Sequence, residues 1–330
     1  MHGVLESATR WPIVLLVVAT GALVQCRAAS QEPPKPSLLP GTQLSVDELQ
    51  AQFQRVSAGR RLRPESWPNG ARVAVALSFD IDNAAGNLAR GDLRPESLSR
   101  GEYGAVDGLP RVLRVLDKHE VPATFFIPAV SSILHPQMIL DILAREHHEI
   151  GAHGWIHENL AQVTGEAEEK RLLDQSIDYL TEVTGTRPVG FRSPGATYSP
   201  HTFKLLKEAG FLYESTLMAS DDAYELLIDG EPSGLIEVPI EWILDDFPYF
   251  QNAINGSLPD PEQVFRIYRS EFDVAYEEGG LFVLTMHPHV IGHRSRAAEL
   301  DKLITYIKTK EGIWFATHEQ VARYVLEEAG

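Results

Sequence analysis

Hydrophobic positions along the chain fall into two patterns, short continuous runs and helical repeats. Residues 72–79 read RVAVALSF, a β-branched and apolar run that is typical of a buried strand. Residues 106–119 repeat apolar side chains at helical spacing, as an amphipathic helix does. The same criteria predict further strands at 123–127, 149–151, 188–192, 234–240, 281–286 and 313–315. They predict further helices at 136–147, 165–183, 199–210, 261–278, 296–310 and 318–328.

The order of these elements indicates the fold class. Strands and helices alternate, and repeated β-then-α units build a parallel sheet. This many units over about 260 residues favour a barrel over an open sheet, within a single α/β domain. Residues 83–105 are rich in Gly, Arg and Ser, and we expect them to form a long loop at the mouth of a site.

The N-terminal segment has the pattern of an export signal. Residues 13–24 are apolar but too few for a membrane-spanning helix, and small residues follow them. We therefore expect a signal peptide at 1–29, with Cys26 offering an alternative lipoprotein-type anchor. A proline-rich linker and N-terminal extension would cover 30–66, and the main folded domain 67–330. The mature protein would have no transmembrane span and would be periplasmic, in the cell envelope or secreted.

Composition narrows the classes of function. The 330 residues are 44% hydrophobic and 23% charged, which is typical of a globular protein. The 29 Lys and Arg against 46 Asp and Glu give a net charge of −17, which argues against nucleic acid as a partner. Because Cys26 is the one cysteine, a metal site would need His and carboxylate ligands, and the chain has 12 histidines.

Titratable or cationic residues follow four of the predicted strands. They are Asp80 with Asp82, His153 with His157, Arg192, and His287. Chemistry in a barrel belongs at these carboxyl ends of strands. On a helical turn, His153 and His157 would face one direction and bind a divalent ion together. Asp82 offers a third ligand, which leaves open coordination positions as in a catalytic site, and Asp80 is a candidate general base.

These residues lie within five short motifs. In chain order, the motifs are Ser78-Phe79-Asp80-Ile81-Asp82, His153-x3-His157, Arg192-x-Pro194, Glu241-Trp242 and Leu284-x2-His287. Their order and spacing resemble the polysaccharide deacetylase superfamily, also called the NodB-homology domain or carbohydrate esterase family 4. The resemblance covers roughly residues 70–325. It implies a distorted (β/α) TIM-like barrel that hydrolyses N-acetyl groups of aminosugars in a polysaccharide.

The resemblance also implies a cofactor and roles for particular residues. The cofactor would be a divalent metal, zinc by preference, with Co²⁺, Ni²⁺ or Mn²⁺ as alternatives. The implied metal ligands are Asp82, His153 and His157. The implied catalytic residues are Asp80 as base, His287 as acid and Arg192 as partner of the base. Substrate contacts are expected from Gly195, whose surroundings would help an oxyanion, and from Trp242 and Glu241.

Departures from the common motifs leave several alternatives open. Ile81 separates two aspartates that are adjacent in most members, a form that resembles a branch with peptidoglycan deacetylases, cyclic imide hydrolases and metal-free allantoinases. An acetylated glycan such as peptidoglycan or chitin is the favoured substrate for an exported protein, and a cyclic imide or amide is the alternative. A non-catalytic glycan-binding protein would be expected to lose the base or a ligand, and neither is lost. Three carboxylates compete as support for the acid, namely Glu241, Asp245 and Asp246.

Other residues near the motifs have further candidate roles. A nucleophilic Ser193 is disfavoured because a nucleophile elbow uses the N–H of the next residue, and Pro194 has none. His289, two positions after His287, is expected to line the pocket or the surface. Aromatic side chains at Trp155, Tyr249 and Phe250 could stack on sugars or belong to the core.

Overall fold

The computed structural model describes residues 40–251 and 259–329. The chain divides into two compact units, Met1–Ser45 and Val46–Gly330. In the first unit, the described part contains one 3-10 turn, η1 (Pro40–Gln43). The expected signal peptide and Cys26 lie outside the described residues. Across 40–251 and 259–329, no helix combines the length and the apolar character that a bilayer span requires.

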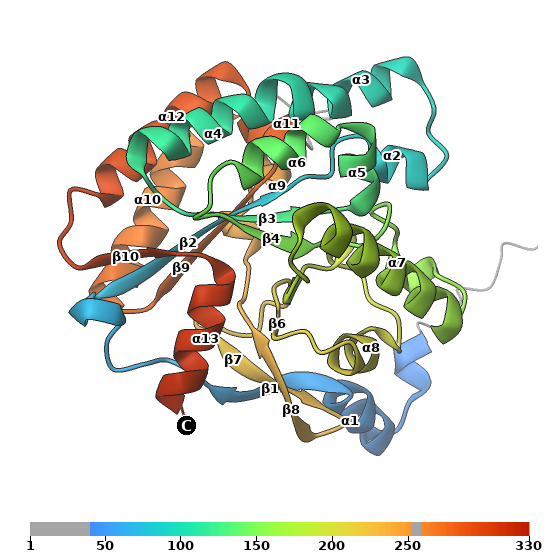
Figure 1. Ribbon diagram of the computed structural model, residues 1–330. Coiled ribbons are helices and arrows are strands. Elements are labelled where there is room, and N and C mark those ends of the chain that lie inside the picture. The colour runs from blue at the N-terminus through green and yellow to red at the C-terminus, as the bar shows by residue number, and fades with distance from the viewer. Residues whose placement is uncertain (1–39, 252–258, 330) are drawn as a thin grey trace, which may run out of the picture. The chain divides into compact units, whose positions relative to one another are not determined.

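The second unit contains the strands and helices of Figure 1. Its strands are β1 (Val56–Arg61), β2 (Val73–Asp80), β3 (Thr124–Ile127), β4 (Glu149–Ala152), β5 (Gly190–Phe191), β6 (Tyr213–Glu214), β7 (Tyr224–Ile228), β8 (Glu231–Glu237), β9 (Leu281–Met286) and β10 (Ile313–Ala316). Its α-helices are α1 (Val46–Gln54), α2 (Ala85–Ala89), α3 (Pro95–Tyr103), α4 (Leu109–His119), α5 (Ala129–Leu134), α6 (Pro136–Leu143), α7 (Glu166–Thr184), α8 (Thr202–Glu208), α9 (Asp246–Phe250), α10 (Pro261–Glu278), α11 (Pro288–Ile291), α12 (Arg294–Ile307) and α13 (His318–Ala329). The shorter turns are η2 (Pro68–Gly70), η3 (Gly104–Gly108, a π-helix), η4 (Leu160–Gln162), η5 (Pro194–Ala196) and η6 (Trp242–Leu244).

The strands form one curled, mixed sheet in the order β1-β7-β8-β6-β5-β4-β3-β2-β10, with β9 paired to β2. The pairs from β8 through β6, β5, β4 and β3 to β2 are parallel, as are those of β2 with β9 and β10. A bridge between Asp245 and Thr285 links the segment after β8 to β9. The expected α/β class and distorted barrel are therefore confirmed.

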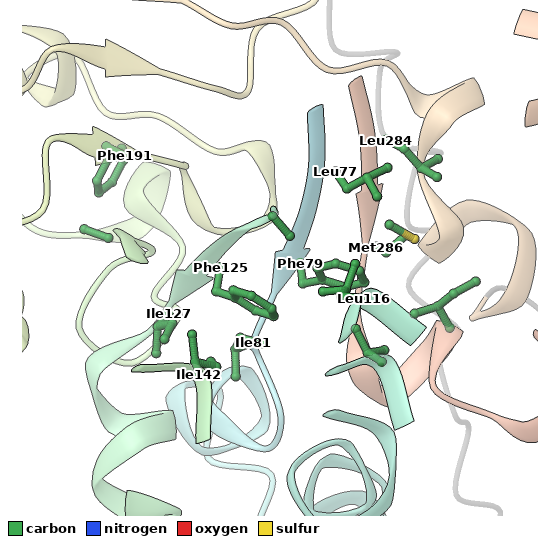
Figure 2. Packing of buried hydrophobic residues seen from close by; sticks show 14 of the residues in the cluster. Leu77, Phe79, Ile81, Leu116, Phe125, Ile127, Ile142, Phe191, Leu284 and Met286 are labelled. Carbon is green, nitrogen blue, oxygen red and sulfur yellow. The ribbon is translucent and has the colours of Figure 1, made fainter. Parts of the chain in front are cut away.

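Alternation along β2 separates the two faces of the sheet. Val73, Val75, Leu77 and Phe79 pack into the cluster beneath the helices, which Figure 2 shows around Phe79 and Leu116. The intervening Ala74 and Ala76 belong to a second cluster on the inner face. Side chains of a strand point to opposite faces in turn, so Ser78 and Asp80 continue the inner series.

The structure departs from the sequence-based expectation in three places. Residues 83–105, expected as a loop, contain α2 and α3, and α3 begins with Pro95 in its first turn, where proline fits a helix. The range 30–66, expected as linker and extension, contains α1 and β1. Strands β1, β7 and β8 pair antiparallel, which makes the sheet mixed instead of wholly parallel.

Candidate active site

On four strands, the side chains that point to the inner face of the sheet come together at its carboxyl edge. On β4, Ile150 and Ala152 face the helices, so the next residue, His153, faces inward. On β9, Leu281 and Val283 belong to the inner cluster, and the series continues to His287. Together with Asp80 after β2 and Arg192 after β5, these side chains share one buried centre. The pleat of the sheet thus brings the sequence-predicted residues together.

Asp82, His153 and His157 form the first cluster at this centre. The Asp82 carboxylate lies 3.3 Å from Nε2 of His153 and 3.4 Å from Nε2 of His157. His153 donates its Nδ1 proton to the carbonyl of Arg192 at 2.7 Å, which leaves Nε2 directed at Asp82. Oδ1 of Asp82 is buried and accepts no hydrogen bond. One carboxylate and two imidazole nitrogens therefore converge on one point, and such a donor set fits a divalent cation.

The electrostatics of Asp82 agree with this geometry. Burial opposes ionisation of the carboxyl, but the neighbouring imidazoles, above all that of His157, outweigh burial. They hold the pKa of Asp82 well below its usual value. The carboxylate is therefore charged at neutral pH, as a ligand of a divalent ion must be.

A turn, and not a helix, orients the two histidines. The expectation of a helical turn at 153–157 is wrong, because Gly154 has φ +74° and His157 has φ +59°. The Glu158 carboxylate closes this turn by accepting the backbone N–H groups of Trp155 and Ile156 at 3.1 and 2.8 Å. The imidazoles still converge on Asp82, but the left-handed residues bring them together.

Arg192 orients the second aspartate, Asp80. Its guanidinium is 1% exposed and donates to Oδ1 of Asp80 at 2.8 Å and to the hydroxyl of Ser78 at 2.9 Å. The carbonyl of Ser215 fixes Nε of Arg192 at 2.7 Å, and the guanidinium packs over the ring of Phe126. Oδ1 of Asp80 is thus occupied. Oδ2 lies 3.8 Å from Nε2 of His153 and faces the centre.

His287 and Asp246 form the third component. Asp246 accepts from Nδ1 of His287 at 2.7 Å and from its backbone N–H at 3.0 Å. Nε2 of His287 lies 3.9 Å from Asp80 and 3.8 Å from Asp82. Burial alone would lower the pKa of the imidazole, but the Asp246 carboxylate outweighs burial and raises the pKa of His287 well above its usual value.

Of the three carboxylates left open as support for His287, the structure places Asp246 in direct contact. Asp245 lies farther from the imidazole, at 3.8 Å, and caps α9 by accepting the N–H of Phe247. Within the described residues, no hydrogen bond or ion pair joins Glu241 to His287. Asp245 and Asp246 are adjacent and alike in the sequence, so the backbone turn into α9 decides which of them reaches the imidazole.

The three residues expected to contact the substrate lie in two different places. Gly195 has φ +58° in η5, and Cε1 of His157 lies 4.0 Å from the position that its Cβ would occupy. Gly195 therefore borders the centre. Trp242 and Glu241 lie in the segment between β8 and α9, and Trp242 is 48% exposed.

The sequence did not predict two residues that support the site, Ser215 and Thr216. The carbonyl of Ser215 accepts from Arg192, and the hydroxyl of Thr216 accepts from the N–H of Ser193. They were missed because β6, which precedes them, is only two residues long.

Comparisons with known proteins agree with this geometry. Residues 97–213 match the family model described as polysaccharide deacetylase. The chain is 30% identical to the peptidoglycan deacetylase of Helicobacter pylori over 76% of this chain and 95% of that protein. Its structure is similar to that of a Mycobacterium smegmatis protein assigned to the polysaccharide deacetylases, with 38% identity, a TM-score of 0.75, and 83% and 96% of the two chains covered. It is also similar to PuuE allantoinase, with 26% identity, a TM-score of 0.70, and 81% and 94% covered.

Proposed function

Because the chain belongs to the polysaccharide deacetylase family of carbon–nitrogen hydrolases, we propose that it removes N-acetyl groups from aminosugars of a glycan. Peptidoglycan is the favoured polymer, since the Helicobacter pylori relative carries that name, and a chitin-like glycan is the second choice. The observation that carries the proposal is the unpartnered Oδ1 of Asp82. It faces Nε2 of His153, and the other oxygen of the same carboxylate faces Nε2 of His157. Beside them lie one arginine-bound carboxylate and one carboxylate-bound histidine.

Asp82, His153 and His157 would hold a divalent cation, zinc by preference. Their ligand atoms lie within 4.8 Å of one another. Two imidazoles and one carboxylate suit zinc and leave coordination positions open. When bound, the cation supplies Lewis acidity, which polarises a carbonyl and lowers the pKa of water.

Asp80 would act as the general base. Arg192 occupies one carboxylate oxygen and leaves Oδ2 directed to the centre. A water molecule that attacks the acetyl carbonyl must lose a proton, and Oδ2 is placed to accept it. The backbone N–H groups near Gly195 would stabilise the oxyanion that forms on the former carbonyl oxygen.

His287 would supply the proton that the leaving amine needs. An amine is a poor leaving group until its nitrogen is protonated, and Nε2 of His287 points to the centre. Asp246 fixes Nδ1 as a donor, so Nε2 is the nitrogen that gives up its proton. The charge of Asp246 also stabilises the imidazolium before transfer.

A second candidate function is hydrolysis of a cyclic imide or amide. The similarity to PuuE allantoinase supports it, because its name indicates a small cyclic amide as substrate. The same base, acid and cation would open such a ring. The two candidates differ in their products, since ring opening releases no acetate.

We infer that the protein is exported through residues 1–29, with Cys26 as a candidate lipid anchor. Sequencing the N-terminus of the mature protein should show a start after about residue 25–29. Uncleaved chain in the cytosol would contradict export.

Product analysis tests the function. Purified protein would be incubated with peptidoglycan, chitooligosaccharides and cyclic imides, and acetate and ammonia release measured with and without a chelator. We expect acetate from a glycan, loss of the activity with chelator and recovery with added zinc. Ring opening of an imide without acetate would support the second candidate. Activity that chelation does not reduce would contradict the role of the cation.

A further inference from the structure

A cavity of about 280 Å³ opens beside Asp82 and His157. Helices α2 and α3 supply part of its wall, and Phe247 and Gln251 contribute to it from α9 and the residue that follows. This space adjoins the centre through the two proposed ligands, but its lining includes neither the base nor the acid assigned above. A group that occupies the cavity would therefore lie next to the proposed cation site.

The wall of the cavity is locally basic. Arg90 and Arg100 both line it, and Asp82 is the one carboxylate among its lining residues. Within residues 40–251 and 259–329, no ion pair joins either arginine to a carboxylate, and Arg100 donates to the amide oxygen of Gln251. By contrast, Arg94 in the same segment is paired with Asp92 at 2.8 Å. In a chain of net charge −17, two arginines at this wall have no anionic partner among the described residues.

Two glycines leave room for the side chains of polar residues that line the cavity. A Cβ at Gly86 would lie 3.0 Å from Nδ1 of His157 and 3.3 Å from Nη1 of Arg90, so the missing side chain lets the guanidinium stand beside a proposed ligand. Gly104 similarly leaves room for Oδ1 of Asn83. Asn83 is 4% exposed with φ +46°, and its Oδ1 accepts no hydrogen bond. Asn83 thus places a buried, unused acceptor at the wall that it shares with the two arginines.

We propose that this cavity binds a carboxylate-bearing substituent of the substrate, with Arg90 and Arg100 as specificity-determining residues. Guanidinium groups match carboxylates in charge and geometry. Oδ1 of Asn83 would accept an N–H or O–H from the same substituent. The identity of the reacting acetamide rests on the proposed function, but the charge preference of the cavity does not.

The carboxylate could belong to a sugar or to a small acid, and matched ligand pairs distinguish these sources. One pair is N-acetylmuramic acid and its methyl ester, and the other is N-acetylglycine and its methyl ester. Isothermal titration calorimetry with the metal-loaded, full-length protein would give four affinities. We expect the acid to bind about tenfold or more tightly than its ester in at least one pair, since hydrogen bonds to charged groups are strong. The pair that shows the preference identifies the source.

Variants connect this preference to the arginines. Arg90→Gln and Arg100→Gln should each reduce the ratio of acid to ester affinity, and the double variant should bring it close to one. Arg94→Gln is the matched control, because it removes the same charge from the same segment while its guanidinium is already paired with Asp92. Its ratio should equal that of the wild type.

Several outcomes would overturn the proposal. They are equal binding of acid and ester in both pairs, a preference that survives the double variant, and an equal loss in Arg94→Gln. A preference that disappears when the metal is chelated would assign the carboxylate to the cation instead. Failure of the proposed function is recognised separately: a protein that prefers acids but releases no acetate from any glycan retains this cavity and loses that function.

Discussion

At the scale of single residues, two aspartates that look alike in the sequence occupy different surroundings. Asp80 is bound by Arg192, whereas Asp82 faces two imidazoles and keeps one buried oxygen without a hydrogen bond. The Asp-x-Asp motif predicts that both lie at a strand end. The difference between their surroundings comes from the residues that other strands place beside them.

The two aspartates should respond differently to substitution. Asp82→Ala removes one of three proposed ligands, so bound metal should be lost or severely weakened. Asp80→Asn keeps shape but cannot accept a proton, so metal should stay while turnover falls by about 10²–10⁴. Metal analysis and acetate release on both purified variants check this. A metal-free Asp80→Asn or a metal-replete Asp82→Ala would reverse the roles.

Asp246 should affect turnover through His287. Asp246→Asn removes the charge that stabilises the imidazolium and the strict acceptor that fixes its tautomer. We expect kcat to fall at least about tenfold with metal content unchanged. Asp245→Asn is the neighbouring control, since Asp245 lies farther from the ring and an asparagine still caps α9. Equal losses in the two variants would count against a specific role for Asp246.

The sequence predicted the strand-end residues because their motifs are local. It left Asp246 unresolved, because its contact with His287 joins positions 41 residues apart. It could not predict Ser215 or Thr216 either, since hydroxyl residues are common and their partners come from another strand.

At the scale of elements, the well-predicted ones have strong local patterns. The boundaries of β9 and α10 agree with the predictions. Strand β9 is a continuous apolar run. Helix α10 is delimited by Asp260 as its N-cap, Pro261 in its first turn and Gly279 as its C-cap. Strand β1 was missed because Val56–Arg61 is largely polar and becomes a strand by pairing with β7. Such pairing leaves no signal in the segment itself.

Close packing of η3 against α11 should be sensitive to a single methyl group. Gly108 has an ordinary φ of −65°, but a Cβ there would overlap the carbonyl of Pro288. Gly108→Ala should therefore lower the free energy of unfolding by about 1–3 kcal/mol. Turnover should fall too, since Pro288 directly follows His287.

Urea unfolding and acetate release would measure both effects. Gly41→Ala is the control, because nothing lies within 4 Å of its Cβ position. If Gly108→Ala matched Gly41→Ala in stability, the close contact would have no energetic weight.

At the scale of the whole molecule, a buried pair of acids links stability to pH. Glu214 and Glu237 end β6 and β8, are fully buried, and each has one oxygen without another partner. Burial, followed by the charge of Glu214, raises the pKa of Glu237 well above its usual value. A proton shared between the two carboxyl groups satisfies both free oxygens.

Removing this titration should flatten the dependence of stability on pH. A raised folded-state pKa contributes stability that is complete below the unfolded pKa and is lost as pH rises through the folded value. Glu237→Gln replaces the shared proton with an amide donor, so the variant should gain stability relative to the wild type as pH rises from about 4.3, the ordinary pKa of an unfolded Glu, through neutrality. Urea midpoints across that range would show it. Parallel curves for the two proteins would mean that the pair does not titrate there.

The position of β2 at the junction of β3, β9 and β10 determines when the active centre can form. Ser78 on β2 and its partner Leu284 on β9 are 206 positions apart. Chains emerge from the ribosome at about 5–20 residues per second, so the strand that carries Asp80 waits about 10–40 s for this neighbour. His287 follows the same late strand. The centre is therefore completed near the end of synthesis, and no fragment that stops before residue 281 contains it.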